Sequence, residues 1–454
     1  MNQPNKEKLL SGWGNYPRLK CRVYRPEKQT DVISILNKNS SVIARGQGRS
    51  YGDASLNKDC VILSERLDKF IDFDASLGII TVQAGVVLAE ILEVIIPKGW
   101  ILPVIPGTKY VSAGGAFASN VHGKNHAKVG DFANHVTQIH LLLASGEALI
   151  CSAMIHPDIF WATAGGMGLT GIIKQLSIQL MPITSLSLLT ETKKTKNILE
   201  MVECFQNASE HSEYMIGWID HFATHDALGR GVFQKAIHKT ETVRTDALLH
   251  YKRKSKGITI PTFFPSCLLN KYSMALYNIK RFFSYSTDWK KEIINFDGFF
   301  HPLDHLQHWN RLYGKNGFFQ YQCVLPETND VAENLKELLA FIQMRGHFSF
   351  LAVLKYHREH KGLLSFPIRG YSLALDFPNT HDSRILEQEL NAKVANMGGR
   401  VYLGKDALMT PALFEKMYHK ELPQWRQIVQ RLDPGGKWTS AMSDRLNMKG
   451  NPHA

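Results

Sequence analysis

The chain has 454 residues, 44% of them hydrophobic and 21% charged, with a net charge of +12. These values are typical of a globular protein of two or more domains with a large buried core, and the positive charge favours an anionic partner. Six cysteines are scattered singly without a CxxC pair, which argues against a zinc ribbon or a disulfide scaffold and for reduced thiols.

The N-terminal residues 1–20 lack the apolar core of a signal peptide. The most apolar region, 85–107, is interrupted by charged residues and a proline, so no stretch reaches the roughly 18 apolar residues of a membrane span. The sequence therefore predicts a cytoplasmic protein without a transmembrane segment. Peripheral association of this cytoplasmic protein with the inner membrane is the alternative expectation.

The first 185 residues or so predict short strands separated by turns. Helices are expected at 30–39 with Thr30 as the N-cap, at 87–100 with a stop at Pro97 and Gly99, and at 158–163. Strands are expected at 41–46, 60–64, 69–74, 78–85, 135–152 (two strands around Ser145-Gly146) and 170–183. This order is a mixed α+β pattern and not a strict alternation of strands and helices.

Aromatic residues become frequent between 189 and 400, and basic residues gather at 251–257 and 271–292. Such charge runs usually form solvated, mobile loops. Basic residues interleaved with Phe, Tyr and Trp also suit an anionic interface, so a mobile cover over a ligand entrance or a membrane-facing segment is the alternative. The final segment predicts a helical stretch over 410–434.

The stretch IARGQGRSYGDASLN, residues 43–57, places three glycines and two arginines where a strand should end. Glycines allow a backbone nest of N–H groups, and arginine adds charge-assisted bonds to phosphate. An ordinary turn with solvated arginines is the alternative reading of these residues.

A second glycine-rich stretch, GGMGLTG, contains the pattern GxGxxG at Gly166, Gly168 and Gly171. A nicotinamide-binding fingerprint needs a strand before it and a helix after it. Here a helix-like segment precedes the pattern and a strand-like segment follows it. The context is inverted, and a nicotinamide site is rejected at this point.

Residues 106–136 combine small residues with His122, His126 and His135. The spacing of His122 and His126 raises a zinc hypothesis, but Gly123 lies between them and no glutamate follows His122. No metal is therefore predicted. The histidines are expected either to support the core or, for His122, to face a ligand.

Three glycine-containing stretches follow one another in a fixed order: the turn near residue 46, PGT and GGA within 107–116, and GGMGLTGII at 165–173. This order resembles the FAD-binding domain (PCMH type) of the vanillyl-alcohol oxidase family. The longer motifs ARGQGRSYGD, SNVHGKNH, FWATAGGMGLTGII, LDFPNT and GGRVYLGKD are similar to those of the decaprenylphosphoryl-β-D-ribose 2-oxidase family, over about residues 12 to 446.

The resemblance implies a two-domain α+β flavoprotein. An FAD-binding domain at 12–188 would be followed by a sheet-based substrate domain at 189–398 and by a segment at 399–454 that returns to the FAD domain. FAD contacts are expected from Ala44, Arg45, Gly46, Gln47, Gly48, Arg49, Ser50, Tyr51, Gly52, Asp53, Gly107, Ser112, Ala113, Gly114, Gly115, Ser119, Asn120, His122, Ile173 and Tyr402. Substrate contacts are expected from Lys124, Gln320, Gln322 and Lys355.

The resemblance also implies catalytic roles for Lys405, His122 and Tyr51. Tyr51 stands where many flavin oxidases carry a histidine bonded to FAD, so FAD is expected to be held non-covalently. Lys405 is expected beside the substrate hydroxyl, as a base or as a fixed positive charge. A surface lysine paired with Asp406 is the alternative interpretation of Lys405.

The reaction implied is oxidation of the 2-hydroxyl of a polyprenyl-phosphate-linked pentose, with an NADH-dependent ketoreductase completing an epimerisation. Ala374 and Phe300 depart from the cysteine and the tyrosine of mycobacterial members, which leaves the identity of the sugar open. One rival is an oxidase of a free sugar, alditol or aldonolactone. The other is a basic nucleic-acid-binding protein, although no nucleic-acid partner is expected.

Overall fold

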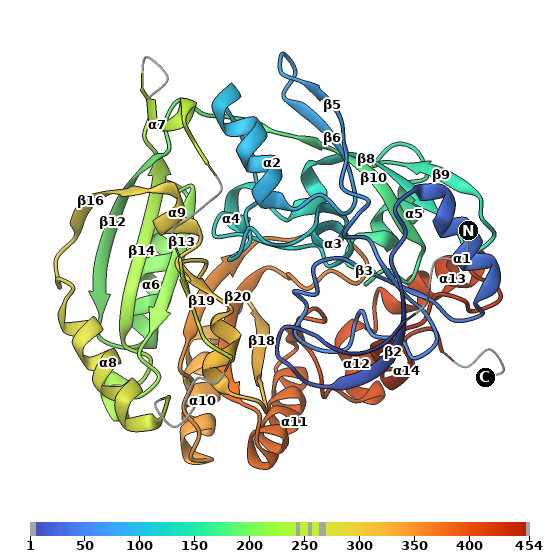
Figure 1. The fold of residues 1–454 in the computed structure, drawn as a ribbon. Coiled ribbons are helices and arrows are strands. Elements are labelled where there is room, and N and C mark those ends of the chain that lie inside the picture. The colour runs from blue at the N-terminus through green and yellow to red at the C-terminus, as the bar shows by residue number, and fades with distance from the viewer. Residues whose placement is uncertain (1–5, 242–245, 253–256, 263–268, 451–454) are drawn as a thin grey trace.

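A computed structural model gives the structure of the protein and describes residues 6–241, 246–252, 257–262 and 269–450. The fold is α+β, as predicted, and is built around a four-stranded, a five-stranded and an eight-stranded sheet (Figure 1). Most neighbouring strands pair antiparallel; the parallel pairs are β2 with β4, β3 with β4 and β15 with β17.

The two smaller sheets come from the N-terminal 180 residues or so, where the sequence predicts short strands. The four-stranded sheet has the order β1 (Lys6–Ser11), β2 (Arg18–Tyr24), β4 (Val61–Leu63), β3 (Ile43–Arg45). The five-stranded sheet has the order β5 (Phe70–Asp74), β6 (Ile79–Gln83), β10 (Ile172–Gln179), β8 (Val136–Leu142), β9 (Ala148–Cys151). A short ribbon pairs β7 (Trp100–Ile101) with β11 (Met181–Pro182), so the strand expected at 170–183 is divided.

The three helices expected in this region are present as α1 (Gln29–Lys38), α2 (Leu88–Ile95) with its 3₁₀ extension η1 (Ile96–Lys98), and α5 (Pro157–Thr163). Three further helical elements were not predicted, namely α3 (Ala113–Ala118), α4 (His126–Val129) and η2 (Phe132–His135). The prediction of Thr30 as an N-cap is wrong, because α1 begins earlier, at Gln29. The backbone N–H of Lys28 donates to the Asp31 carboxylate at 3.0 Å, which stabilises this earlier start.

The eight-stranded sheet occupies the middle of the chain. Its order is β16 (Lys290–Asn295), β12 (Ser187–Thr195), β14 (Gly231–His238), β13 (Tyr214–Ile219), β19 (Ala352–His357), β20 (Gly370–Pro378), β18 (Phe318–Pro326), β21 (Arg400–Val401). The helices α6 (Ile198–Ala208), α10 (Val331–Met344) and α11 (His381–Asn396) pack on it. The remaining short elements are η3 (His225–Ala227), α7 (Asp246–Leu249), α9 (Phe296–Phe300), η5 (Trp309–Tyr313) and the pair β15 (Ile258–Thr259) with β17 (Leu306–Gln307).

Alternation along the strands of this sheet separates its two faces. Leu354 on β19, Leu373 on β20 and Cys323 on β18 are fully buried on the face that packs against the helices. Their strand neighbours, such as Val353 and Gln322, point to the opposite face. That second face turns toward the N-terminal loops and forms one wall of the site described below.

The basic segment 251–292 is not a continuous loop. Helix α8 (Lys271–Phe283) lies within it, which corrects the loop interpretation for these residues. Asn270 caps this helix by accepting hydrogen bonds from the backbone N–H groups of Tyr272 and Ser273 at 2.9 and 3.1 Å. Arg253 and Lys254 of the same segment lie outside the described residues.

The C-terminal segment forms α12 (Pro411–Tyr418), α13 (Leu422–Leu432) and α14 (Ala441–Arg445). The single helical stretch expected at 410–434 is therefore divided in two. Pro423 explains the division, because proline lacks the N–H needed inside a helix and is tolerated in a first turn, where it stands in α13.

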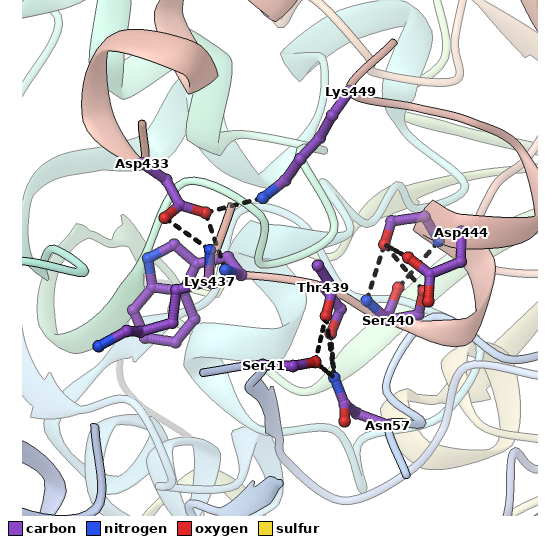
Figure 2. A network of polar contacts seen from close by, with 10 residues as sticks. Ser41, Asn57, Asp433, Lys437, Thr439, Ser440, Asp444 and Lys449 are labelled. Carbon is purple, nitrogen blue, oxygen red and sulfur yellow. Dashed lines mark hydrogen bonds and ion pairs between the residues drawn. The ribbon is translucent and has the colours of Figure 1, made fainter. Parts of the chain in front are cut away.

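This segment lies beside the N-terminal sheet, and Figure 2 shows the contacts. Asn57 donates to the backbone oxygen of Thr439 and to Ser41 Oγ, both at 2.8 Å. Asp433 accepts from the backbone N–H of Trp438 at 2.8 Å and from Lys449 at 2.7 Å. The domain limits at 188 and 398 remain a prediction; β21 joins the large sheet just after the second of them.

None of the described helices is long and apolar enough to cross a bilayer. Among the cysteines, Cys21, Cys60, Cys151, Cys204 and Cys323 are buried free thiols, as the sequence predicts. Cys267 lies outside the described residues.

Candidate active site

A cavity of about 790 Å³ lies between the N-terminal loops and the second face of the large sheet. All three glycine-rich stretches line it, through residues such as Gly48, Gly107 and Gly168. Residues far apart in the sequence thus meet at one site.

Most of the predicted site residues line this cavity. They are Ala44, Gly46, Gln47, Gly48, Arg49, Ser50, Tyr51, Gly107, Ser112, Gly114, Gly115, Ser119, His122, Lys124, Ile173, Gln320, Gln322, Lys355, Tyr402 and Lys405. The predicted residues outside the lining are Arg45, Gly52, Asp53, Ala113 and Asn120.

Three of those outside the lining have structural partners. The Arg45 guanidinium donates to the Ser11 backbone oxygen at 2.7 Å and to Ser55 Oγ at 3.0 Å. Asp53 pairs with Arg445 at 2.8 Å, and Asn120 donates to Ser365 Oγ at 2.6 Å. These side chains hold the loops in place rather than facing the cavity.

The first two loops fit a bound dinucleotide. Gly48 has a φ of +61°, and a Cβ there would lie 2.3 Å from the Arg45 guanidinium, so the turn requires glycine. At Gly107 a Cβ would meet no atom within 4 Å, which leaves the backbone open to a ligand. Arg49, stacked over the Trp13 ring at 4.4 Å, brings a guanidinium to the cavity wall for a pyrophosphate.

Lys405 meets Tyr51 at the cavity wall. Its Nζ lies 3.5 Å from the centroid of the Tyr51 ring, and the backbone N–H of Tyr51 donates to the Gly404 oxygen at 2.9 Å. Asp406 is instead paired with Arg445 at 2.9 Å, which excludes the interpretation of Lys405 as a surface lysine bound to Asp406. Burial lowers the pKa of Lys405, which favours the neutral amine.

A buried carboxylate that was not among the predicted site residues supports this corner. Asp376 on β20 accepts from Gln320 Nε2 at 2.7 Å and from the Tyr313 hydroxyl at 3.3 Å. Burial raises the pKa of Asp376. The negative charge of Asp376 raises the pKa of Lys405 and so offsets part of the lowering that burial causes. Gln320 is thereby fixed with its amide group at the cavity wall.

His122 faces the same corner from the loop after α3. Gln322 Nε2 lies 2.9 Å from His122 Nε2, while the buried His122 Nδ1 has no partner among the described residues. Burial and the nearby Lys355 hold the pKa of His122 well below its usual range, so the ring is neutral. With Gln322 donating to Nε2, the ring proton resides on Nδ1.

The other two histidines of the 106–136 stretch have structural contacts. His126 Nδ1 accepts from the backbone N–H of Arg358 at 3.2 Å, and His135 Nε2 lies 3.0 Å from the Val129 oxygen. Within the described residues no group of three or more His, Cys, Asp or Glu side chains is arranged to hold a metal ion.

Lys124 and Lys355 place two more cationic groups at the cavity wall. The Lys124 ammonium donates to the Phe299 backbone oxygen and lies 4.2 Å from the centroid of the Phe299 ring. Burial lowers the pKa of Lys355 to about 8, and burial together with the charge of Lys355 lowers that of Lys124 to about 7. A bound anion offsets the electrostatic repulsion between two such positively charged groups.

A buried ion pair ties the two walls of the cavity together. Lys109, 1% exposed, binds Asp297 of α9 at 2.7 Å, and its backbone N–H donates to Asp304 at 3.0 Å. The sequence analysis did not single out Lys109, although a lysine inside the glycine-rich stretch PGTKYVSAGG is a signal that could have done so.

Comparison with known proteins now adds to this geometry. Residues 22–152 match the family model "FAD binding domain". The chain is 33% identical to the decaprenylphosphoryl-β-D-ribose oxidase of Mycolicibacterium smegmatis, over 98% of both chains.

The chain belongs to the decaprenylphosphoryl-β-D-ribose oxidase family.

More distant relatives include lactone oxidases. The chain is 22% identical to the L-gulonolactone oxidase of Bos taurus over 96% of both chains, and 26% identical to a putative D-arabinono-1,4-lactone oxidase of Neurospora crassa over 42% of this chain and 35% of the relative. As a member of the decaprenylphosphoryl-β-D-ribose oxidase family, the protein is an FAD-dependent oxidoreductase acting on CH–OH groups.

The presence of Tyr51 in place of a histidine predicts that the flavin is bound non-covalently. Its phenol lacks the ring nitrogen through which a histidine bonds to FAD. Acid precipitation of the purified protein should therefore release all of the yellow flavin into the supernatant. Flavin that stays with the protein pellet after washing would contradict the prediction.

Proposed function

We propose that the protein oxidises the 2-hydroxyl of a polyprenyl-phosphate-linked pentose to a ketone. The observation that carries this proposal is the order of groups along the cavity wall. A corner with Lys405, His122 and Gln320 suits a sugar hydroxyl, and the two lysines Lys124 and Lys355 nearby suit a phosphate. The name of the relative from Mycolicibacterium smegmatis supports the same substrate class.

Bound FAD supplies the acceptor for the hydride that leaves the carbinol carbon. Lys405, as a neutral amine, takes the hydroxyl proton as the C–O double bond forms. The neutral His122 ring, held by Gln322 through Nε2, lines the same corner and helps to position the hydroxyl there. Gln320, held by Asp376, orients a neighbouring hydroxyl of the pentose.

An oxidase of a free sugar, alditol or aldonolactone is the second candidate, and the lactone oxidases among the relatives favour it. Such substrates carry no phosphate, so they would leave the two ammonium groups of Lys124 and Lys355 without an anion. We therefore rank this candidate lower.

Anaerobic bleaching of the flavin absorbance near 450 nm (on the order of the band that flavin cofactors show) separates the two candidates. Prenyl-phosphoryl ribose should bleach the flavin at micromolar concentrations, whereas free ribose, alditols and aldonolactones should not. Bleaching by a free sugar or lactone as efficiently as by the lipid-linked sugar would overturn the proposal.

The ketone product needs a second enzyme if the sugar is to be epimerised. An NADH-dependent ketoreductase that delivers hydride to the opposite face of C2 would convert the ribose to the arabinose configuration. Product analysis by NMR after adding such a reductase and NADH should show the inverted C2; unchanged ribose would exclude this step.

Helix α8 supports peripheral contact of a cytoplasmic protein with an anionic membrane. Tyr272, Leu276, Ile279 and Phe283 follow helical spacing along one stripe and are 75, 69, 43 and 65% exposed. The basic residues Lys271 and Lys280 lie on the same helix. Exposed apolar and basic residues together suit a helix lying in the headgroup region.

Substitution of this stripe tests the membrane contact. Leu276→Asp combined with Phe283→Asp should weaken binding to anionic liposomes in a co-sedimentation assay, because it removes apolar area and adds repelling charge. The matched control places the same two changes at the exposed Leu77 and Met154, outside α8. Equal binding of both double variants would contradict the assignment of α8.

A further inference from the structure

The outermost strand of the large sheet, β16, has an open edge. Among the described residues it pairs with β12 alone and ends the sheet at the side opposite β21. Five of its six residues are exposed, and Figure 1 shows the strand at the margin of the sheet, beside β12. An exposed edge strand offers unpaired N–H and C=O groups and is a template for pairing with another strand.

The contacts with β12 show which backbone groups of β16 point outward. Thr190 Oγ1 donates to the Glu292 backbone oxygen at 3.0 Å, so Glu292 turns its backbone N–H and C=O groups toward β12. Because the direction of these groups alternates along an antiparallel strand, Lys291 and Ile293 turn theirs toward the open edge. A second strand can therefore bind Lys291 and Ile293 without disturbing the ladder with β12.

The side chains of this edge are complementary to themselves. When two copies of β16 pair antiparallel about Lys291, Lys290 of each copy faces Glu292 of the other, and Trp289 faces Ile293. Trp289 and Ile293 are 43 and 61% exposed, and Lys290 and Glu292 form an exposed pair at 2.6 Å within one copy. The two Lys291 side chains then face each other, but each lies 3.5 Å from Glu191 of its own chain, which offsets their repulsion.

The charges also select this register. Hydrogen bonding from Lys291 and Ile293 allows a second arrangement, centred on Glu292, in which two glutamates face each other. Like charges directly opposite each other destabilise an antiparallel pair, whereas opposite charges stabilise it. The arrangement about Lys291 is therefore favoured.

A groove of about 420 Å³ borders the same edge. Its apolar residues are Leu189 on β12, Ile237 on β14 and Ile293 on β16, which are 40, 40 and 61% exposed. The register sets them in one row, since Leu189 faces both Ile237 and Ile293. A second copy paired about Lys291 places its Trp289 beside Ile293, at the end of this row, and so covers apolar surface that is exposed in the single chain.

We propose that β16 is a docking edge for a second copy of this chain, with the two β16 strands paired antiparallel about Lys291. The charges make the edge selective, because a strand without acidic and basic residues in the matching order leaves Lys290 and Glu292 unpaired. One strand pair and its flanking side chains form a small interface, so association is reversible and falls in the micromolar range. The proposal is independent of the substrate.

Sedimentation velocity of the full, FAD-loaded chain measures the association. The parent should shift from the 51.3 kDa of one chain toward twice that mass as its concentration rises through the micromolar range. Lys290→Glu sets two acidic groups opposite each other at both symmetric positions, and Glu292→Lys sets two lysines there. Each variant alone should weaken the dimer by about tenfold or more, because both symmetric pairs change from attraction to repulsion.

A mixture of the two variants is the sharpest measurement. A Lys290→Glu chain meets opposite charges on a Glu292→Lys chain at both positions, so the mixture should dimerise as strongly as the parent. Glu333→Lys is the matched control, because it reverses one charge of an exposed pair with Lys336 on α10. This control should associate as the parent does. The concentration series of the parent stands as evidence if a variant fails to fold.

A parent chain that sediments as a monomer throughout the micromolar range would overturn the proposal. A dimer that both charge reversals leave unchanged would do the same, since its interface would lie elsewhere on the molecule. Loss of the dimer in each folded variant without recovery in the mixture would exclude the pairing of Lys290 with Glu292.

Discussion

Lys405→Ala is expected to fold and to remain yellow, yet to reduce its flavin about a hundredfold or more slowly with saturating substrate, the loss typical of a missing acid–base group. Lys405 Nζ lies 3.5 Å from the centroid of the Tyr51 ring at the cavity wall, so truncation to alanine removes the amine from the cavity. Stopped-flow measurement under anaerobic conditions gives the rate. The exposed Lys420→Ala is the matched control and should reduce its flavin at the parent's rate.

Two further measurements separate the roles of Lys405. Burial lowers its pKa below the ordinary value of about 10.4, so a base role makes the rate rise with pH and level off earlier than an exposed lysine would allow. Lys405→Arg keeps the charge but cannot accept a proton at these pH values. A fast arginine variant would show that a fixed charge suffices. Parent-like rates in Lys405→Ala would remove this residue from the chemical step.

Arg445→Met is expected to lower the free energy of unfolding by about 3 to 5 kcal/mol, the cost of leaving buried charges unpaired. Arg445 binds Asp53 at 2.8 Å and Asp406 at 2.9 Å, and the side chains of these acids are 4 and 0% exposed. Chemical denaturation of the FAD-loaded protein, followed by circular dichroism, measures the loss.

The control for Arg445 is Arg431→Met, which removes an exposed pair with Asp158 and should cost less than about 1 kcal/mol. Adding Asp53→Asn to Arg445→Met should restore part of the lost stability, because one of the unpaired charges is then gone. If Arg445→Met unfolds at the parent's denaturant concentration, the ion pairs do not hold the C-terminal helix to the FAD loop.

The strands, and the residues that we propose for the reaction, could be predicted from the sequence. Strands such as β6 and β8 follow from β-branched and apolar residues between turn signals, and Lys405 and His122 stand inside long motifs that resemble one family. The sequence also contains a signal for helix α8, since Tyr272, Leu276, Ile279 and Phe283 recur at helical spacing. The frequent basic residues of the same segment favoured the loop interpretation instead.

Contacts between residues far apart in the chain could not be predicted from the sequence. The support of Gln320 by Asp376 depends on the register of β18 against β20. The alignment of Ala374, Val353, Trp218 and Val232 along the cavity depends on three such registers at once. The use of Arg45 and Asp53 inside the fold likewise depends on partners elsewhere in the chain. A sequence pattern gives the face of a strand, but the neighbour across the sheet is set by the whole fold.

The contacts of Asn57 with Thr439 join residues that are 382 positions apart. During synthesis at about 5 to 20 residues per second, roughly 20 to 80 s separate the appearance of these two partners. Throughout that interval the nascent N-terminal sheet lacks its covering helices and keeps apolar surface open to chaperones. A stop codon anywhere before residue 439 would therefore remove these contacts from the N-terminal sheet.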